Sequence, residues 1–190
     1  MEERGGMNMV LIIVIVIVAL LVIYGIATFN GLVKLRNKAQ AAWAQVDVVL
    51  KRRADLIPNL VETVKGYASH ESKTLTEVMN ARNRYTKATT AEDKIESSNM
   101  LTQALGHLFA VAEAYPDLKA NTNFLELQKQ LQETEDKIQY ARQFYNDDVT
   151  QYKNKCEMFP SNIIAGIGGF KAMPFYEIDE ASREAPKVSF

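Results

Sequence analysis

The sequence has little of what metal sites and catalytic sites require. It contains one cysteine and two histidines in 190 residues, so no disulfide can form within the chain, and a single thiol fits a reducing compartment. Neither His70 nor His107 has a glutamate three positions before it, which excludes the Glu-x-x-His pattern of di-metal helical proteins. No second histidine follows His70 and Glu71 at the zinc-protease spacing. We therefore predict no metal, no cofactor and no enzymatic activity.

An excess of basic charge is also missing. Lysine and arginine total 22, aspartate and glutamate 23, and the net charge is −1, which argues against a nucleic-acid-binding protein. The glycines at 166, 168 and 169 lack the lysine of a phosphate-binding loop. Cys156 has no histidine near it in sequence and lies on an apolar stripe, so we interpret it as a buried structural thiol and not as a nucleophile.

The most informative feature that is present is an uncharged apolar run, Met9–Phe29, preceded by a short segment of residues 1–8. At about 1.5 Å per residue the run is roughly 31 Å long as a helix, which matches the hydrocarbon core of a bilayer. Lys34, Arg36 and Lys38 follow it and outnumber Arg4 before it. By the positive-inside rule the N-terminus faces out and the rest of the chain faces the cytoplasm.

A cleaved signal peptide is the alternative interpretation of this run. Gly25, Ile26 and Ala27 form a small-x-small triplet, and Arg4 supplies a thin positive segment before the run. The apolar region of a signal peptide usually has about 7–15 residues, and this one is longer. We therefore favour a retained transmembrane anchor.

After the anchor, apolar residues recur at three- and four-residue spacings, which predicts helix over most of residues 30–158. We expect a new helix or a kink near Pro58, because proline lacks an amide donor. The second helix should end near Lys87 and the third should run from Ala91 to Tyr115. The fourth should begin at residues 121–123. We see no strand signal, so the predicted fold class is all-α: one transmembrane helix followed by an antiparallel, up-and-down bundle of about four long helices.

Each predicted helix carries an apolar stripe that should face the core. The stripe of the fourth helix has a strict seven-residue spacing, which is typical of a long helix packed against others. The expected core residues, in chain order, are Leu32, Leu35, Ala39, Ala42, Val46, Val49 and Leu56; Leu60, Val61, Val64, Tyr67, Leu75, Val78 and Ala81; Ile95, Leu101, Leu105, Leu108 and Val111; and Phe124, Leu131, Ile138, Tyr145 and Tyr152.

Four polar residues interrupt these stripes: Asp47, Arg53, Arg142 and Asn146. A buried charge costs several kcal/mol unless it is paired, so any that point inward should pair across helices. We interpret this set as a structural polar cluster that fixes helix register. A ligand-binding polar pocket is the alternative.

The character of the chain changes over residues 159–190. Small and apolar residues come first, followed by an aromatic stretch and a polar end; the apolar and aromatic candidates for contact are Ile163, Ile164, Ile167, Phe170, Phe175 and Tyr176. This segment could close the protein's own core, bind another subunit or lie on the membrane, because an uncovered apolar patch would be a liability.

Several motifs resemble the bacterial LemA family and follow its order along nearly the whole chain. They are NGLV at residues 30–33, AWAQVDVVLKRRADLIPNLV at 42–61, VKGYASHE at 64–71, AR at 81–82, EAYPDLKA at 113–120, ARQFYN at 141–146, FP at 159–160 and GF at 169–170. The resemblance implies a single-pass protein of the bacterial inner membrane, with its N-terminus out and a cytoplasmic four-helix domain. It implies no known reaction. Some members of the wider family are linked to bacterial organelle membranes, so the resemblance also implies assembly on membranes.

From these observations we predict a non-enzymatic scaffold that is anchored in the lipid bilayer, forms homo-oligomers, and organises or remodels a membrane or its complexes. Other membrane proteins are further candidate partners, and nucleic acid is not. The alternative is a ligand-binding or signalling accessory subunit of another membrane protein.

Overall fold

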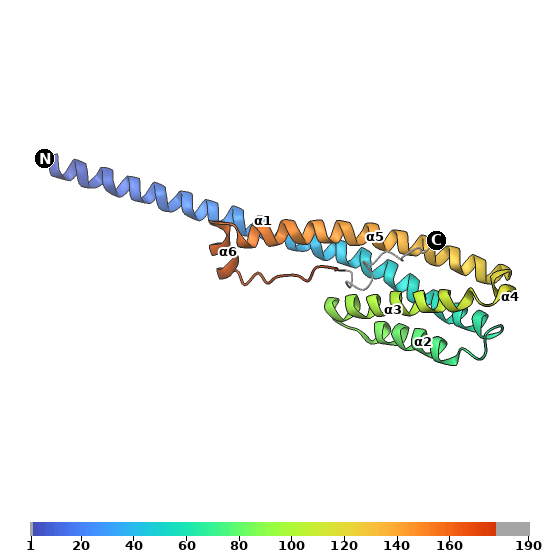
Figure 1. Cartoon of the computed structure of the whole chain (residues 1–190). Coiled ribbons are helices and arrows are strands. Elements are labelled where there is room, and N and C mark those ends of the chain that lie inside the picture. Colours follow the sequence, from blue (N-terminus) through green and yellow to red (C-terminus); the bar gives the residue numbers. More distant parts are fainter. Residues whose placement is uncertain (1, 178–190) are drawn as a thin grey trace, which may run out of the picture. The chain divides into compact units, whose positions relative to one another are not determined.

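The computed structural model describes residues 2–177, with side chains from residue 9 onward. Its helices are α1 (Glu2–Lys65), α2 (Ser72–Lys87), α3 (Ala91–Ala112), α4 (Pro116–Lys119), α5 (Thr122–Glu157) and α6 (Ser161–Ile167) (Figure 1). No strand occurs among the residues described. The all-α fold class predicted from the sequence is confirmed.

No new helix begins near Pro58, so that part of the expectation is wrong. α1 is 64 residues long and runs through Pro58 to Lys65. Proline cannot donate to the carbonyl four residues before it, which here belongs to Ala54. That carbonyl instead accepts a long bond of 3.5 Å from Arg82 Nε of α2. Ile57 and Leu60 on either side of Pro58 are fully buried, so packing holds the helix together across the proline.

The second helix is shorter than expected, because residues 60–65 belong to α1 and residues 66–71 form a turn. Tyr67 lies in this turn and is 43% exposed, so its predicted core position is wrong. The ends of the later helices lie close to the expected positions. Thr90 caps α3 by accepting a bond from the Asp93 amide at 3.1 Å. At the start of α5, the Asn121 side chain accepts from the Phe124 amide at 3.0 Å.

The chain divides into two compact units, and α1 and α5 each contribute to both. Unit 1 comprises described residues 2–41 and 147–173, and unit 2 comprises described residues 42–146 and 174–177. The core of unit 2 draws apolar side chains from α1, α2, α3, α4 and α5. The core of unit 1 is small and centres on Leu32, Tyr152 and Ala165.

The seven-residue stripe predicted for the fourth helix is confirmed. Phe124, Leu131, Ile138, Tyr145 and Tyr152 are each at most 5% exposed. On α1 a matching series of buried positions, again seven residues apart, contains one charged side chain. Its members are Leu32, Ala39, Val46, Arg53 and Leu60.

The apolar run contrasts with these stripes. Every large apolar side chain between residues 9 and 23 is at least 49% exposed. Among the described residues, α1 is the one helix that is long and apolar enough to cross a membrane, and the candidate span within it begins at Met9. Side chains this apolar, left bare along the helix, are typical of a lipid-facing segment.

Candidate functional site

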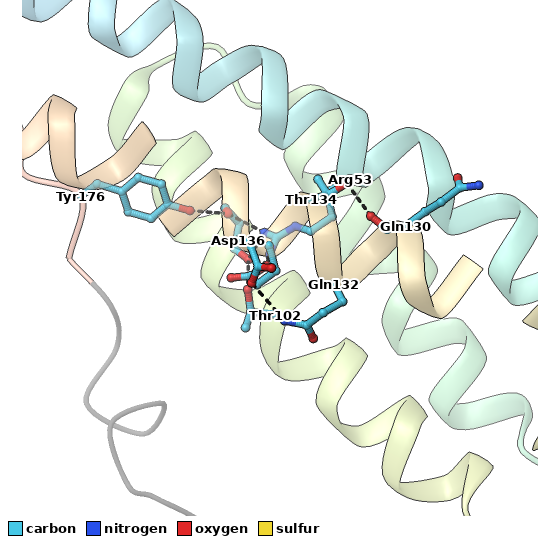
Figure 2. Close-up of polar contacts among 9 residues, drawn as sticks. Arg53, Thr102, Gln130, Gln132, Thr134, Asp136 and Tyr176 are labelled. Carbon is cyan, nitrogen blue, oxygen red and sulfur yellow. Dashed lines mark hydrogen bonds and ion pairs between the residues drawn. The ribbon is translucent and has the colours of Figure 1, made fainter. Parts of the chain in front are cut away.

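The guanidinium of Arg53 is the most deeply buried charge among the described residues of unit 2. Arg53 belongs to α1 and is 2% exposed. Its Nη1 donates to Thr102 Oγ1 and to Glu135 Oε2, both at 2.8 Å. Its Nη2 donates to the Ser98 carbonyl at 2.9 Å and to Ser98 Oγ at 2.6 Å. One side chain therefore ties α1 to α3 and α5 (Figure 2).

This arrangement compensates most of the cost of burying the charge, but not all of it. The Glu135 carboxylate supplies the opposite charge and is 33% exposed, so its other oxygen has access to water. Arg53 Nε is buried and has no hydrogen-bond partner among the described residues. A guanidinium presents five N–H donors, and the one on Nε is enclosed by protein atoms without an acceptor.

A hollow of about 300 Å³ adjoins Arg53 between α3 and α5. Its polar lining includes Thr102, Glu135 and Gln132, and Gln132 Nε2 donates to Asp136 Oδ1 at 3.2 Å (Figure 2). Its remaining lining is mainly apolar, with Phe109 among its members. This volume lies at the lower end of small-molecule sites. Because Glu135 already pairs with Arg53, the charges lining the hollow balance each other.

The C-terminal segment of residues 174–177, which we call the strap, is held against the same network. The hydroxyls of Tyr176 and Ser98 are hydrogen-bonded at 2.6 Å, so Ser98 joins the strap to Arg53 (Figure 2). Asn146 Nδ2 donates to the Tyr176 carbonyl at 3.1 Å, and the Tyr176 amide donates to Asn146 Oδ1 at 2.8 Å. The Arg142 guanidinium lies 5.8 Å from the centre of the Tyr176 ring.

Burial dominates the electrostatics of the strap. Tyr176 is 4% exposed, and burial raises the pKa of its hydroxyl, against the opposing effects of Arg53 and of the Ser98 hydrogen bond. The Tyr145 hydroxyl donates to the Pro174 carbonyl at 2.6 Å. Burial also raises the pKa of Tyr145 to about 12. Both hydroxyls stay protonated at neutral pH and serve as structural hydrogen-bonding groups.

Asp47 lies in a separate network. Its carboxylate accepts from Lys94 Nζ with both oxygens at 2.7 Å, and from the Tyr85 hydroxyl at 3.0 Å. Burial, followed by the bond to Asp47, raises the pKa of Tyr85. Asp47 thus links α1 to α2 and α3.

The structure therefore distributes the four polar residues singled out in the sequence among different partners. Arg53 and Asp47 bond between helices, whereas Arg142 and Asn146 contact the strap. The sequence reasoning missed the partners. Ser98, Thr102 and Glu135 are polar residues on helices with apolar stripes. The signal in the sequence is that Ser98 stands at a stripe position, three residues before Leu101 and one turn before Thr102.

Comparison with known proteins identifies the family. Residues 42–190 match the model of the LemA family. The chain belongs to the LemA family. Two similar proteins, magnetosome proteins MamQ 1 and MamQ 2 of Paramagnetospirillum magneticum, are each 24% identical over 92% of this chain and 74% of their own length. Protein LemA of Metamycoplasma hominis is 26% identical over 72% of this chain and 63% of its own. The apolar helix and the LemA relatives together fit a membrane protein.

Metal ligands are not assembled in the described part of this LemA-family chain. No group of three or more histidine, cysteine, aspartate or glutamate residues there could hold a metal ion. His107 Nδ1 lies 3.2 Å from Glu77 Oε1 on an exposed surface, and His70 is exposed as well. Cys156 is half-buried, and burial raises the pKa of its thiol, which works against nucleophilic reactivity.

The apolar candidates in the C-terminal part face in different directions. Ile164 and Phe170 pack on the core of unit 1, and Tyr176 is buried in unit 2. Phe175 is half-buried. Ile163 and Ile167 are 53% and 82% exposed. Packing on the protein's own units thus accounts for some of these residues and leaves the two isoleucines uncovered.

Proposed function

We propose that this protein is a non-enzymatic, membrane-anchored helical scaffold that self-associates and organises a membrane or its protein complexes. In this proposal residues 9–29 span the bacterial inner membrane, with the N-terminus outside and the remaining helices in the cytoplasm. The observation that carries it is the continuity of α1. The same helix supplies the exposed apolar run and side chains in the cores of both units, so no linker separates anchor and domain.

The relatives support a role at membranes. Two of them carry the name magnetosome protein, and the family resemblance implies members linked to bacterial organelle membranes. A scaffold also fits the way the polar side chains are used. Arg53, Asp47 and Asn146 bond within the protein instead of being presented at an open catalytic surface.

An exposed aromatic pair on α5 is the surface that we assign to self-association. Tyr140 and Phe144 are 67% and 66% exposed and lie one helical turn apart. Lys137 precedes the pair by three residues and Asp147 follows it by three. In an antiparallel pair of α5 helices related by a twofold axis, Tyr140 would face Phe144 of the partner subunit. Lys137 would face Asp147 of the partner subunit. This self-complementarity favours a second copy of the chain as the occupant.

The test measures the mass of the full-length protein in detergent and in nanodiscs by light scattering. Tyr140→Glu with Phe144→Glu should reduce the assembly to monomers, because four carboxylates would meet at the contact. Gln139→Glu with Gln143→Glu is the matched control, since it adds the same charge at exposed positions of the same helix, and it should leave the mass less affected. Lys137→Glu should weaken the assembly and Lys137→Glu with Asp147→Lys should restore it. A monomeric wild-type protein at every concentration would refute self-association.

A ligand-binding accessory role is the second candidate, and the hollow beside Arg53 favours it. Its lining offers polar groups of Thr102, Gln128 and Gln132 to a ligand. Gly106 lines the hollow, and a β-carbon at this position would meet nothing within 4 Å. Gly106→Leu should therefore fill the space without a backbone clash. A small molecule that raises the melting temperature of wild type and of Ala110→Leu, but not of Gly106→Leu, would support this role; a silent screen would count against it.

A further inference from the structure

α6 covers the end of the apolar run of α1 inside unit 1. A β-carbon built on Gly25 would lie 3.7 Å from Ile164 Cδ1. Thr28 is only 5% exposed, in contrast to the bare side chains earlier in the run. The rings of Phe29 and Phe170 meet edge to face with their centroids 5.3 Å apart. The segment that contains α6 therefore contacts one side of the last two turns of the run, while Ile26 and Phe29 remain 58% and 43% exposed.

Two glycines make this contact possible. Gly169 has a φ of 66°, in the left-handed region that glycine adopts without strain. A β-carbon at Gly168 would lie 2.6 Å from the Phe170 ring. Gly169 lets the chain turn after α6 without strain, and Gly168 leaves room for the Phe170 ring, which this turn brings back to Phe29.

The contact fixes the depth of α6 relative to the apolar run. Gly25 lies four residues before the end of the run at Phe29, which is about 6 Å along a helix axis. If the run fills the hydrocarbon core, α6 lies at the boundary between acyl chains and headgroups. Amphipathic helices that lie in this boundary bury their apolar face by about 5–10 Å.

The face of α6 that turns away from α1 is apolar. Ile163 and Ile167, one turn apart, are 53% and 82% exposed, and the preceding Met158 and Phe159 are 62% and 80% exposed. No charged residue occurs between Met158 and Phe170. Four large apolar side chains are thus presented within ten residues, directly beside a helix that is itself apolar and exposed.

Charged residues flank this face in sequence. Lys155 and Glu157 precede it, and Lys171 follows it. The Arg36 guanidinium lies 5.3 Å from the centre of the Phe170 ring. Long basic side chains at such a border extend their charge toward phosphate groups, and the cytoplasmic leaflet carries anionic lipid.

We propose that α6, together with Met158 and Phe159, forms a membrane foot that inserts into the headgroup–acyl boundary of the leaflet where α1 leaves the bilayer. The occupant of the exposed apolar face is lipid, because the face continues the apolar surface of the anchor and contains no charged residue between Met158 and Phe170. The inference rests on the membrane anchoring in the proposed function and does not require self-association. The foot gives the protein a second contact with the bilayer, which would restrict the tilt and rotation of the anchor.

The test places a fluorescent reporter in the foot of the full-length protein in vesicles of mixed zwitterionic and anionic lipid. Trp43 is the single tryptophan, so Trp43→Phe gives a dark background. Ile167→Trp reports on the foot, Val22→Trp on the anchor, and Gln151→Trp on an exposed polar position of α5. Each variant is compared in ordinary lipid and in lipid brominated on the acyl chains, where contact with bromine quenches emission.

The expected result is a blue-shifted, quenched emission for Ile167→Trp and Val22→Trp, and an unquenched, red-shifted emission for Gln151→Trp. Quenching at residue 22 without quenching at residue 167 would overturn the foot and leave the anchor intact. A blue shift at residue 167 that is insensitive to bromine and grows with protein concentration would assign the face to a second copy and equally overturn the proposal. Loss of quenching at residue 22 would refute the anchoring itself.

Discussion

Removing either partner of the buried Arg53–Glu135 pair should have unequal consequences. In Glu135→Gln the guanidinium remains 2% exposed and keeps neutral hydrogen bonds only. Breaking a buried pair by removing one partner costs about 3–5 kcal/mol. Because Glu135 is 33% exposed and glutamine still offers a carbonyl oxygen, we expect a loss of stability of about 2–3 kcal/mol, at or just below the lower end of that range.

Arg53→Met removes the charge itself and should cost only about 1 kcal/mol. The groups left behind have other partners. Thr102 Oγ1 already donates to the Ser98 carbonyl at 3.2 Å, and Ser98 Oγ stays bonded to the Tyr176 hydroxyl. Glu135 can turn to water. The methionine side chain fills much of the volume of the arginine stem.

The measurement is the melting temperature of the full-length protein in detergent, followed by circular dichroism. For a chain of this size, a loss of about 2–3 kcal/mol lowers the melting temperature by about 4–12 °C. The double variant Arg53→Met with Glu135→Gln should be more stable than the sum of the two single changes predicts, because the double variant contains no unpaired charge at this site. If Arg53→Met melts below Glu135→Gln, or if the two changes add, the reasoning from burial and pairing is refuted.

Three further outcomes follow from the other contacts. Asp47→Asn should destabilise unit 2 by about 1 kcal/mol, whereas Asp55→Asn should have little effect in the same thermal assay, because Asp55 is exposed and bonds only Lys51 on its own helix. Tyr145 has a folded pKa of about 12, above about 10 in the unfolded chain, so its contribution to stability is complete below pH 10 and is lost between about pH 10 and 12; urea unfolding across this range should show a fall that is smaller in Tyr145→Phe. Asn146→Ala removes both backbone bonds to Tyr176 and should speed amide hydrogen exchange in residues 174–177, an effect that Asn154→Ala at an exposed position of the same helix should not reproduce.

The elements that the sequence predicted well are those governed by periodicity. The five residues of the α5 seam are buried because a seven-residue spacing keeps them on one face of a long helix. The start of α3 was predictable from Thr90 and the acidic residues that follow it, because capping is local chemistry. Periodicity and capping depend on residues that are close together in the chain, so both can be recognised from the sequence alone.

The errors come from contacts between distant residues. Pro58 weakens a helix locally, but its effect was offset by Arg82, which lies on another helix and supplies a donor for the Ala54 carbonyl. The strap has no periodicity, so nothing in the sequence places Tyr176 against Ser98. Likewise, a polar residue in an apolar stripe predicts that it has a partner without revealing which one. Glu135 is 82 residues away from Arg53 in the chain.

The position of Arg53 within the α1 seam argues for a role in specifying register. An apolar residue there would be buried at a lower desolvation cost. A seam of Leu32, Ala39, Val46 and Leu60 alone would tolerate sliding by one repeat, because an apolar side chain would meet another apolar side chain after the shift. A shift of seven residues on α5 would replace Glu135 with Gln128 or Arg142, leaving the guanidinium unpaired or facing a like charge. We therefore propose that the buried arginine penalises the shifted pairings by several kcal/mol, whereas the native pairing supplies Glu135 as its partner. Ser98 accepts from Arg53 and is also hydrogen-bonded to Tyr176 of the strap. In this proposal Arg53 therefore specifies the register and also holds the residue that Tyr176 contacts.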